Sequence, residues 1–175
     1  MGLIASLFNR PPKVELPSEI YRPLVVDLTN FQFDGLALGE TPAPDRFFFN
    51  LIHNKTFLDE PNGLTLEFSE RRLECIYIEL TRFPGGFTYL GNPISLTTGT
   101  TLADVQSTFG EPYWLDDDVD ETILFYEDGT TELQFEFPDK QHLGVITVML
   151  DPIMAKADLR KAYGVDKPWP PTTSE

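Results

Sequence analysis

Two stretches of this chain alternate between apolar and polar residues, and this alternation is the strongest constraint on its fold. Residues 63–80 and 131–150 each begin with a run in which every second side chain is large and apolar. These positions are Leu64, Leu66 and Phe68 in the first stretch and Leu133, Phe135 and Phe137 in the second. A period of two predicts a strand with one face in a core and the other in water.

Each alternating run is followed by a short polar loop and a second apolar run, which predicts two antiparallel hairpins. The return strands correspond at Ile76, Ile78 and Leu80 in the first hairpin and at Ile146, Val148 and Leu150 in the second. We therefore interpret the hairpins as related copies. Asp128-Gly129 predicts a tight turn before the second copy. Further strands are expected at residues 24–28, 31–33, 47–53, 86–90 and 122–126.

Signals for helices are few. Thr100 or Thr101 is a good N-cap for a helix that ends at Gly110. Asp104 falls in the first turn of that helix, where the helix dipole favours a negative charge. A second helix of about a dozen residues is expected between the pair Asp151-Pro152, which suits the N-cap and N1 positions, and Gly164.

These elements predict an α+β fold of antiparallel sheet, in which two related helix-plus-hairpin repeats precede a C-terminal helix. At 175 residues the chain is expected to form one compact unit. We divide it into an N-terminal extension (1–20), a first α+β repeat with a degenerate helix (21–90), a second α+β repeat (91–150), and a C-terminal helix with a proline-rich tail (151–175).

The segment from Gly99 to Pro112 reads Gly-Thr-Thr-Leu-Ala-Asp-Val-Gln-Ser-Thr-Phe-Gly-Glu-Pro. It resembles the Gly-x-Thr-x-x-x-Val-x-x-x-x-Gly-x-Pro signature of BamE/SmpA-type modules, and the resemblance covers mainly residues 96–150. A similar module occurs in tandem in beta-lactamase inhibitor protein. The resemblance implies a protein-binding role without an active site. Unlike those families, this chain shows no signal peptide, lipobox cysteine or pair of cysteines, so we expect a cytoplasmic protein.

Negative charge is concentrated in one part of the chain. Residues 83–139 contain twelve acidic residues and no lysine or arginine, whereas the other 118 residues hold 16 acidic and 13 basic residues. Most of the net charge of −15 therefore lies in the second repeat. Such a field attracts basic partners and repels nucleic acids and anionic membranes.

The densest acidic cluster follows two aromatic residues, and we select this stretch as the candidate protein-binding site. Its residues are Tyr113, Trp114, Asp116, Asp117, Asp118, Asp120 and Glu121. Aromatic side chains beside charges are typical of interface hot spots. Three alternatives stay open: a solvated acidic loop, a core position for Trp114, and a calcium loop. A calcium loop would place Glu121 where its sharp turn needs glycine.

Other residues with reactive side chains do not form a catalytic or metal-binding pattern. Cys75, the single cysteine, lies in an apolar run and is expected to be a small buried hydrophobe. His53 is expected to be a hydrogen-bonded residue of a strand, and His142 to be solvated at a hairpin tip. We expect no metal, no cofactor and no enzymatic activity.

The sequence therefore predicts a non-enzymatic, acidic protein-binding module. Its most specific form is an immunity or antitoxin-type inhibitor that sequesters a basic effector such as a nuclease toxin. The alternative is a structural or assembly-adaptor protein whose acidic surface is only solubilising. The sequence does not determine the oligomeric state.

Overall fold

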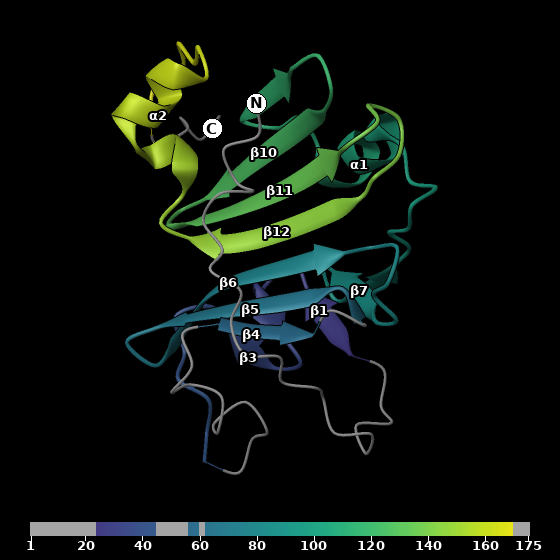
Figure 1. Ribbon diagram of the computed structural model, residues 1–175, viewed down its shortest axis with the longest axis vertical. Helices are drawn as coiled ribbons and strands as arrows, with labels where there is room; N and C mark the ends of the chain where they lie inside the picture. Colours follow the sequence, from purple (N-terminus) through teal and green to yellow (C-terminus); the bar gives the residue numbers. More distant parts are fainter. Residues whose placement is uncertain (1–23, 45–55, 60–61, 170–175) are drawn as a thin grey trace.

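The computed structural model describes residues 24–44, 56–59 and 62–169, and these form two sheets with two short α-helices. The strand order is β3-β2-β1-β7-β8 in the five-stranded sheet and β4-β5-β6-β12-β11-β10-β9 in the seven-stranded sheet. In Figure 1 the lower half of the larger sheet lies in front of β1, β3 and β7, and α1 lies behind its upper half. The structure is mostly β, which agrees with the predicted antiparallel, helix-poor α+β class.

The five-stranded sheet consists of short strands. They are β1 (Val25–Asp27), β2 (Gln32–Phe33), β3 (Leu36–Ala37), β7 (Gly86–Tyr89) and β8 (Asn92–Ile94). β1 pairs with β7 in parallel, and the other strand pairs of this sheet are antiparallel. The sequence predicted β1, β2 and β7 within two residues, but it missed β3 and β8.

The seven-stranded sheet contains both predicted hairpins. Its strands are β4 (Thr56–Asp59), β5 (Leu64–Ser69), β6 (Arg72–Glu79), β9 (Trp114–Asp117), β10 (Thr122–Asp128), β11 (Thr131–Phe137) and β12 (Val145–Leu150). Antiparallel pairing of β6 with β12 joins the β5–β6 hairpin to the β11–β12 hairpin. β4 and β9 were missed, and the strand expected at 47–53, with His53, lies outside the described residues.

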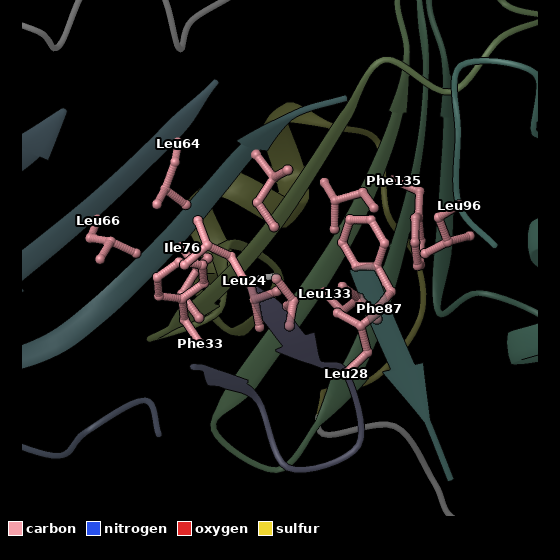
Figure 2. Packing of buried hydrophobic residues seen from close by; sticks show 14 of the residues in the cluster. Leu24, Leu28, Phe33, Leu64, Leu66, Ile76, Phe87, Leu96, Leu133 and Phe135 are labelled. Atoms are coloured by element: carbon pink, nitrogen blue, oxygen red, sulfur yellow. The ribbon is translucent and has the colours of Figure 1, made fainter. Parts of the chain in front are cut away.

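The main hydrophobic core lies between the two sheets, as Figure 2 shows. The apolar positions of both alternating runs point into it, and Leu64, Leu66 and Phe135 are fully buried there. β1 contributes Val26 from the opposite layer. The predicted period of two therefore identified the core-facing side of each hairpin.

Helix α1 (Leu102–Phe109) begins and ends where the sequence predicted. Thr101 is its N-cap and forms a capping box with Asp104, and Gly110 follows the helix with a φ of 81°. Val105 is fully buried. The ring of Phe109 lies 4.8 Å from that of Phe135 on β11 and 4.5 Å from that of Tyr89 on β7, so α1 packs against the main core beside these two strands.

The predicted C-terminal helix of a dozen residues is wrong. The segment instead forms a 3₁₀ turn, η4 (Ile153–Ala155), and a short helix, α2 (Ala157–Ala162), separated by Lys156 in an extended conformation. Asp151 and Pro152 form no side-chain cap, whereas Gly164 follows α2 with the positive φ expected of it. A tertiary contact accompanies the break: Met154 is fully buried, and its N–H donates to Glu132 on the sheet at 3.2 Å. The Met154 carbonyl accepts a hydrogen bond from the Arg160 side chain at 2.7 Å.

Neither helix of the described part of the chain is long and apolar enough to cross a membrane.

The capping box should carry a measurable share of the stability of the fold. Thr101→Ala removes the acceptor for the Asp104 N–H and should lower the free energy of unfolding by about 1 kcal/mol. Thr98→Ala, at an exposed threonine just before the helix, is the matched control and should have little effect. Urea denaturation of both variants measures the difference, and equal stabilities would contradict the assigned cap.

Candidate protein-binding surface

The side of β9–β12 that faces away from the main core is covered by the chain's own C-terminal segment. We call this side the C-terminal face. The sequence predicted that the polar positions of β11 would be wet, but Glu132 and Gln134 are only 0% and 1% exposed. The expectation of one wet face is therefore wrong for β11, because η4 packs over it: the N–H of Met154 donates to Glu132 at 3.2 Å.

A second, smaller hydrophobic cluster fixes this segment to the sheet. Its buried members are Ile123, Phe125, Met154 and Val165, and Tyr113, Trp114, Tyr163 and Trp169 pack against them. The ring centroids are 5.8 Å apart for Phe125 and Tyr163 and 5.7 Å apart for Tyr113 and Trp169, both edge-on. Edge-to-face contacts of this kind add to the gain from apolar burial.

Tyr113 and Trp114, two of the predicted binding residues, take part in this docking. The Tyr113 hydroxyl lies within 3.3 Å of the Lys167 and Pro168 carbonyls, and the Lys167 ammonium group donates to the Tyr113 carbonyl at 2.8 Å. Trp114 is half-buried, and its indole N–H is buried without an acceptor among the described residues. Both aromatic side chains thus support the acidic strand from within the protein.

A pair of carboxyl groups lies beneath this cover. Glu127 and Glu132 are direct partners across β10 and β11, and Gln134 also donates to Glu132. As a carboxylate, Glu127 would have no donor for either buried oxygen. A proton resolves this, because a protonated Glu127 can donate to Glu132. Burial, this hydrogen bond and the charge of Glu132 accordingly raise the pKa of Glu127 well above its usual range.

Further carboxyl groups lie on the same face of the sheet, farther along the strands. Burial and the charge of Glu121 raise the pKa of Glu136 to about 7, although the Thr147 hydroxyl opposes the shift. Burial, followed by the charges of Asp118 and Asp117, raises the pKa of Asp116. The C-terminal face is therefore acidic as well as covered.

The predicted acidic residues come together in the β9–β10 hairpin. Asp117 forms an ion pair with Lys140 at 2.8 Å and accepts a hydrogen bond from the Thr122 hydroxyl, and these partners hold its pKa below the usual range. Asp116 is half-buried on the C-terminal face. Asp118 and Asp120 are exposed in the connecting loop, and Glu121 is half-buried at its end. A role for these residues in binding stays a prediction.

The hairpin does not have the form of a calcium loop of the helix–loop–helix type. Its loop leads into strand β10 rather than into a helix. Within the described ranges, no group of three or more His, Cys, Asp or Glu side chains could hold a metal ion. Cys75 is half-buried on β6, and burial raises the pKa of its thiol. His142 is exposed and pairs with Asp139 at 2.7 Å.

Sequence reasoning treated Glu127, Glu132 and Glu136 only as surface charge. Their alternation along β10 and β11 was visible, but the alternation alone did not show that a segment from beyond residue 150 covers them. The apolar residues Met154, Tyr163 and Val165 were the available signal. They needed a surface to bury them, and the polar side of β11 is part of that surface.

Comparisons with known proteins add little to this description. No protein-family model matches the chain, and no curated protein matches it. Among solved structures, the chain is similar to a DUF4309 family protein (YjgB) from Bacillus subtilis, with a TM-score of 0.40 and 20% sequence identity over 67% of this chain and 84% of that one. A likeness of this degree carries no argument about function.

The buried carboxyl groups predict that stability falls as the pH rises through neutrality. Glu136 has a pKa of about 7 in the folded chain, above its ordinary value of 4.5, and Glu127 is shifted in the same direction. The folded chain therefore binds these protons more tightly than the unfolded chain. Their stabilising effect is complete below a pH of about 4.5 and is lost as the pH rises through about 7 and beyond. Thermal unfolding followed by circular dichroism should show a melting temperature that decreases over this range.

A substitution separates this effect from general charge repulsion. Glu127→Gln keeps the shape of the side chain but removes one titrating group, so the decrease with pH should become smaller. Asp128→Asn is the matched control, because it removes an exposed charge next to it and keeps a turn that asparagine and glycine favour. If Glu127→Gln and the control retained the same decrease as the original chain, the buried pair would not be its source.

Proposed function

We propose that this chain is a non-enzymatic protein-binding module whose acidic β9–β10 hairpin captures a basic partner. In its most specific form, the module is a cytoplasmic immunity or antitoxin-type inhibitor of a basic effector such as a nuclease toxin. Its carboxylates would occupy the place of the phosphates of the toxin's substrate and so block the toxin's active site. No metal or cofactor enters this proposal.

The observation that carries the proposal is the charge of one short hairpin at the end of the sheet. Five acidic residues lie between the end of β9 and the start of β10: Asp116, Asp117, Asp118, Asp120 and Glu121. Lys140 pairs with Asp117, but the hairpin itself contains no basic residue. Clustered charge of one sign steers oppositely charged proteins and raises their association rate.

The hairpin is also held in place before any partner arrives. The Thr122–Asp117 hydrogen bond, the Lys140 ion pair and the aromatic contacts of Tyr113 and Trp114 all restrain it. A surface that is already ordered loses less conformational entropy on binding than a flexible loop does. Such ordering is expected of a specific binding surface and is not needed for a loop that only improves solubility.

The two-repeat organisation belongs to the same proposal. β6 pairs with β12 so that Ile76 lies opposite Val148 and Ile78 lies opposite Ile146. In the sequence match, Ile76 corresponds to Ile146 and Ile78 corresponds to Val148. Each residue therefore lies opposite the counterpart of its neighbour, as in two copies related by an approximate two-fold axis. This symmetry supports two related modules, and the resemblance to BamE/SmpA-type modules and to beta-lactamase inhibitor protein supports protein binding.

The second candidate is an assembly adaptor that binds through apolar contacts and for which the acidic hairpin is solubilising surface. Leu90, on the turn between β7 and β8, is 67% exposed. This apolar side chain away from the hairpin supports the second candidate. Salt separates the two candidates. Binding through the hairpin should weaken strongly with salt, whereas binding through apolar contacts should change little.

Co-expression tests the inhibitor directly. The product of the open reading frame adjacent to this one is expressed alone and together with this chain, and cell growth is measured. The proposal expects growth arrest by the neighbouring protein alone, rescue by this chain, and a complex of the two purified proteins. A neighbour that is harmless, or that kills cells despite co-expression, would count against the inhibitor.

Removing the charge of the hairpin should slow capture without unfolding the protein. In the variant Asp116→Asn, Asp117→Asn, Asp118→Asn and Asp120→Asn, the association rate constant with the partner at low salt should fall by about tenfold or more. Stopped-flow mixing measures this rate, and circular dichroism checks the fold.

The matched control removes four exposed acidic side chains elsewhere. Its substitutions are Glu40→Gln, Glu70→Gln, Asp158→Asn and Asp166→Asn. It changes the net charge by the same amount but leaves the acidic hairpin unchanged. The association rate constant of the control should therefore fall much less. Equal rates for the two quadruple variants would mean that overall charge, rather than the hairpin, attracts the partner.

A further inference from the structure

Within the part of the chain that the structure describes, strand β9 has an open edge. It is the last strand of the seven-stranded sheet there and pairs on one side only, with β10. Alternate residues of an edge strand direct their N–H and C=O groups away from the sheet, where another chain can pair with them. Beyond the ladder with β10, no backbone hydrogen bond joins Trp114–Asp117 to the described part of the chain.

Exposed apolar side chains lie on β9 and in the loop that follows it. Within the described residues, four large hydrophobic side chains are exposed, and two of them, Leu115 at 37% and Val119 at 84%, belong to the β9–β10 hairpin. Leu115 and Asp116 are neighbours and point to opposite faces of the sheet. The edge therefore offers an apolar contact on one face and a carboxylate on the other.

We propose that the open edge of β9 binds an extended segment of a basic partner, which adds to the seven-stranded sheet as an eighth strand. This inference rests on the proposed function and specifies how the partner is held. In the added strand, a lysine or arginine lies opposite Asp116 and an apolar side chain lies opposite Leu115. Backbone hydrogen bonds supply affinity, and the alternating side chains supply specificity.

Charge determines which kind of strand fits. A second copy of this chain is a poor occupant, because pairing β9 with another β9 brings two sets of carboxylates together, and like charges opposite each other destabilise a sheet. With a net charge of −15, two copies would also repel each other at long range. A basic segment reverses both effects.

The environment of Asp116 also favours a cation. Lys140 forms its ion pair with Asp117, and no ion pair joins Asp116 to a described residue. Burial and the charges of Asp118 and Asp117 make the ionised form of Asp116 unfavourable, which is why its pKa is raised. A lysine or arginine placed opposite would relieve this cost on binding.

The test uses a short fluorescent peptide in which lysine and valine alternate, with both ends blocked. Two further peptides carry N-methyl groups on alternate residues, one peptide on its lysines and the other on its valines. Each therefore lacks the N–H donors along one of its two edges but keeps its charge. Fluorescence anisotropy measures binding of all three to the full chain at low salt. Pairing at an edge uses one side of the peptide, so one methylated peptide should bind about tenfold more weakly or worse while the other binds like the parent.

Hydrogen exchange locates the site. With the parent peptide bound, amide exchange should slow on β9 and stay unchanged on β8, which is an edge of the other sheet. Protection of β9 together with the asymmetric effect of methylation supports the inference.

Other outcomes separate this inference from the proposed function. Equal binding of all three peptides, lost in the quadruple Asp→Asn variant of the hairpin, would overturn docking at the edge and leave the acidic capture surface intact. Failure of the parent peptide to bind at low salt would likewise overturn docking at the edge, while rescue of growth on co-expression would still uphold the inhibitor. Slowed exchange on β8 instead of β9 would place the contact elsewhere and also overturn the inference.

Discussion

The antiparallel pairing of β6 with β12 is the contact on which the rest of the structure depends. Without it, the sheet would divide into a three-stranded part (β4, β5 and β6) and a four-stranded part (β9 to β12). Their union gives one sheet of seven strands, whose apolar face packs against the smaller sheet and α1. The same pairing places β9–β12 at one end of the sheet, so that β9 is an edge strand among the described residues.

Charge is distributed unequally along this sheet. Around the β5–β6 hairpin, basic residues lie close to the acidic ones, and Glu70 pairs with Arg72 and Glu79 with Arg82. On β9–β12, carboxyl groups are buried beneath the C-terminal segment or gathered near the turn between β9 and β10. Surface ion pairs add little to stability, so the contrast between these two parts of the sheet bears on its surface charge more than on how firmly it folds.

The sequence predicted those parts of the fold that depend on local chemistry. The period of two in β5 and β11 records which side of each strand is buried, and the capping of α1 by Thr101 needs only residues within one helical turn. β3, β8 and β9 are too short to show a period, and the two aspartates of β9 suggested a loop. The break at Lys156 and the burial of Glu132 follow from a contact between segments about twenty residues apart, which no local pattern records. The candidate binding residues are neighbours in the sequence and their role in binding stays a prediction, whereas the supporting role of Tyr113 and Trp114 became visible only in the structure.

The position of the two tryptophans has a spectroscopic consequence. Trp114 and Trp169 are the only tryptophans of the chain, and both pack in the smaller cluster on the C-terminal face rather than between the sheets. Intrinsic fluorescence therefore reports whether the C-terminal segment is docked, while far-ultraviolet circular dichroism reports the strands. If the segment detaches before the sheets unfold, the two signals will give different midpoints, and a two-state analysis of either one would misstate the stability of the whole protein.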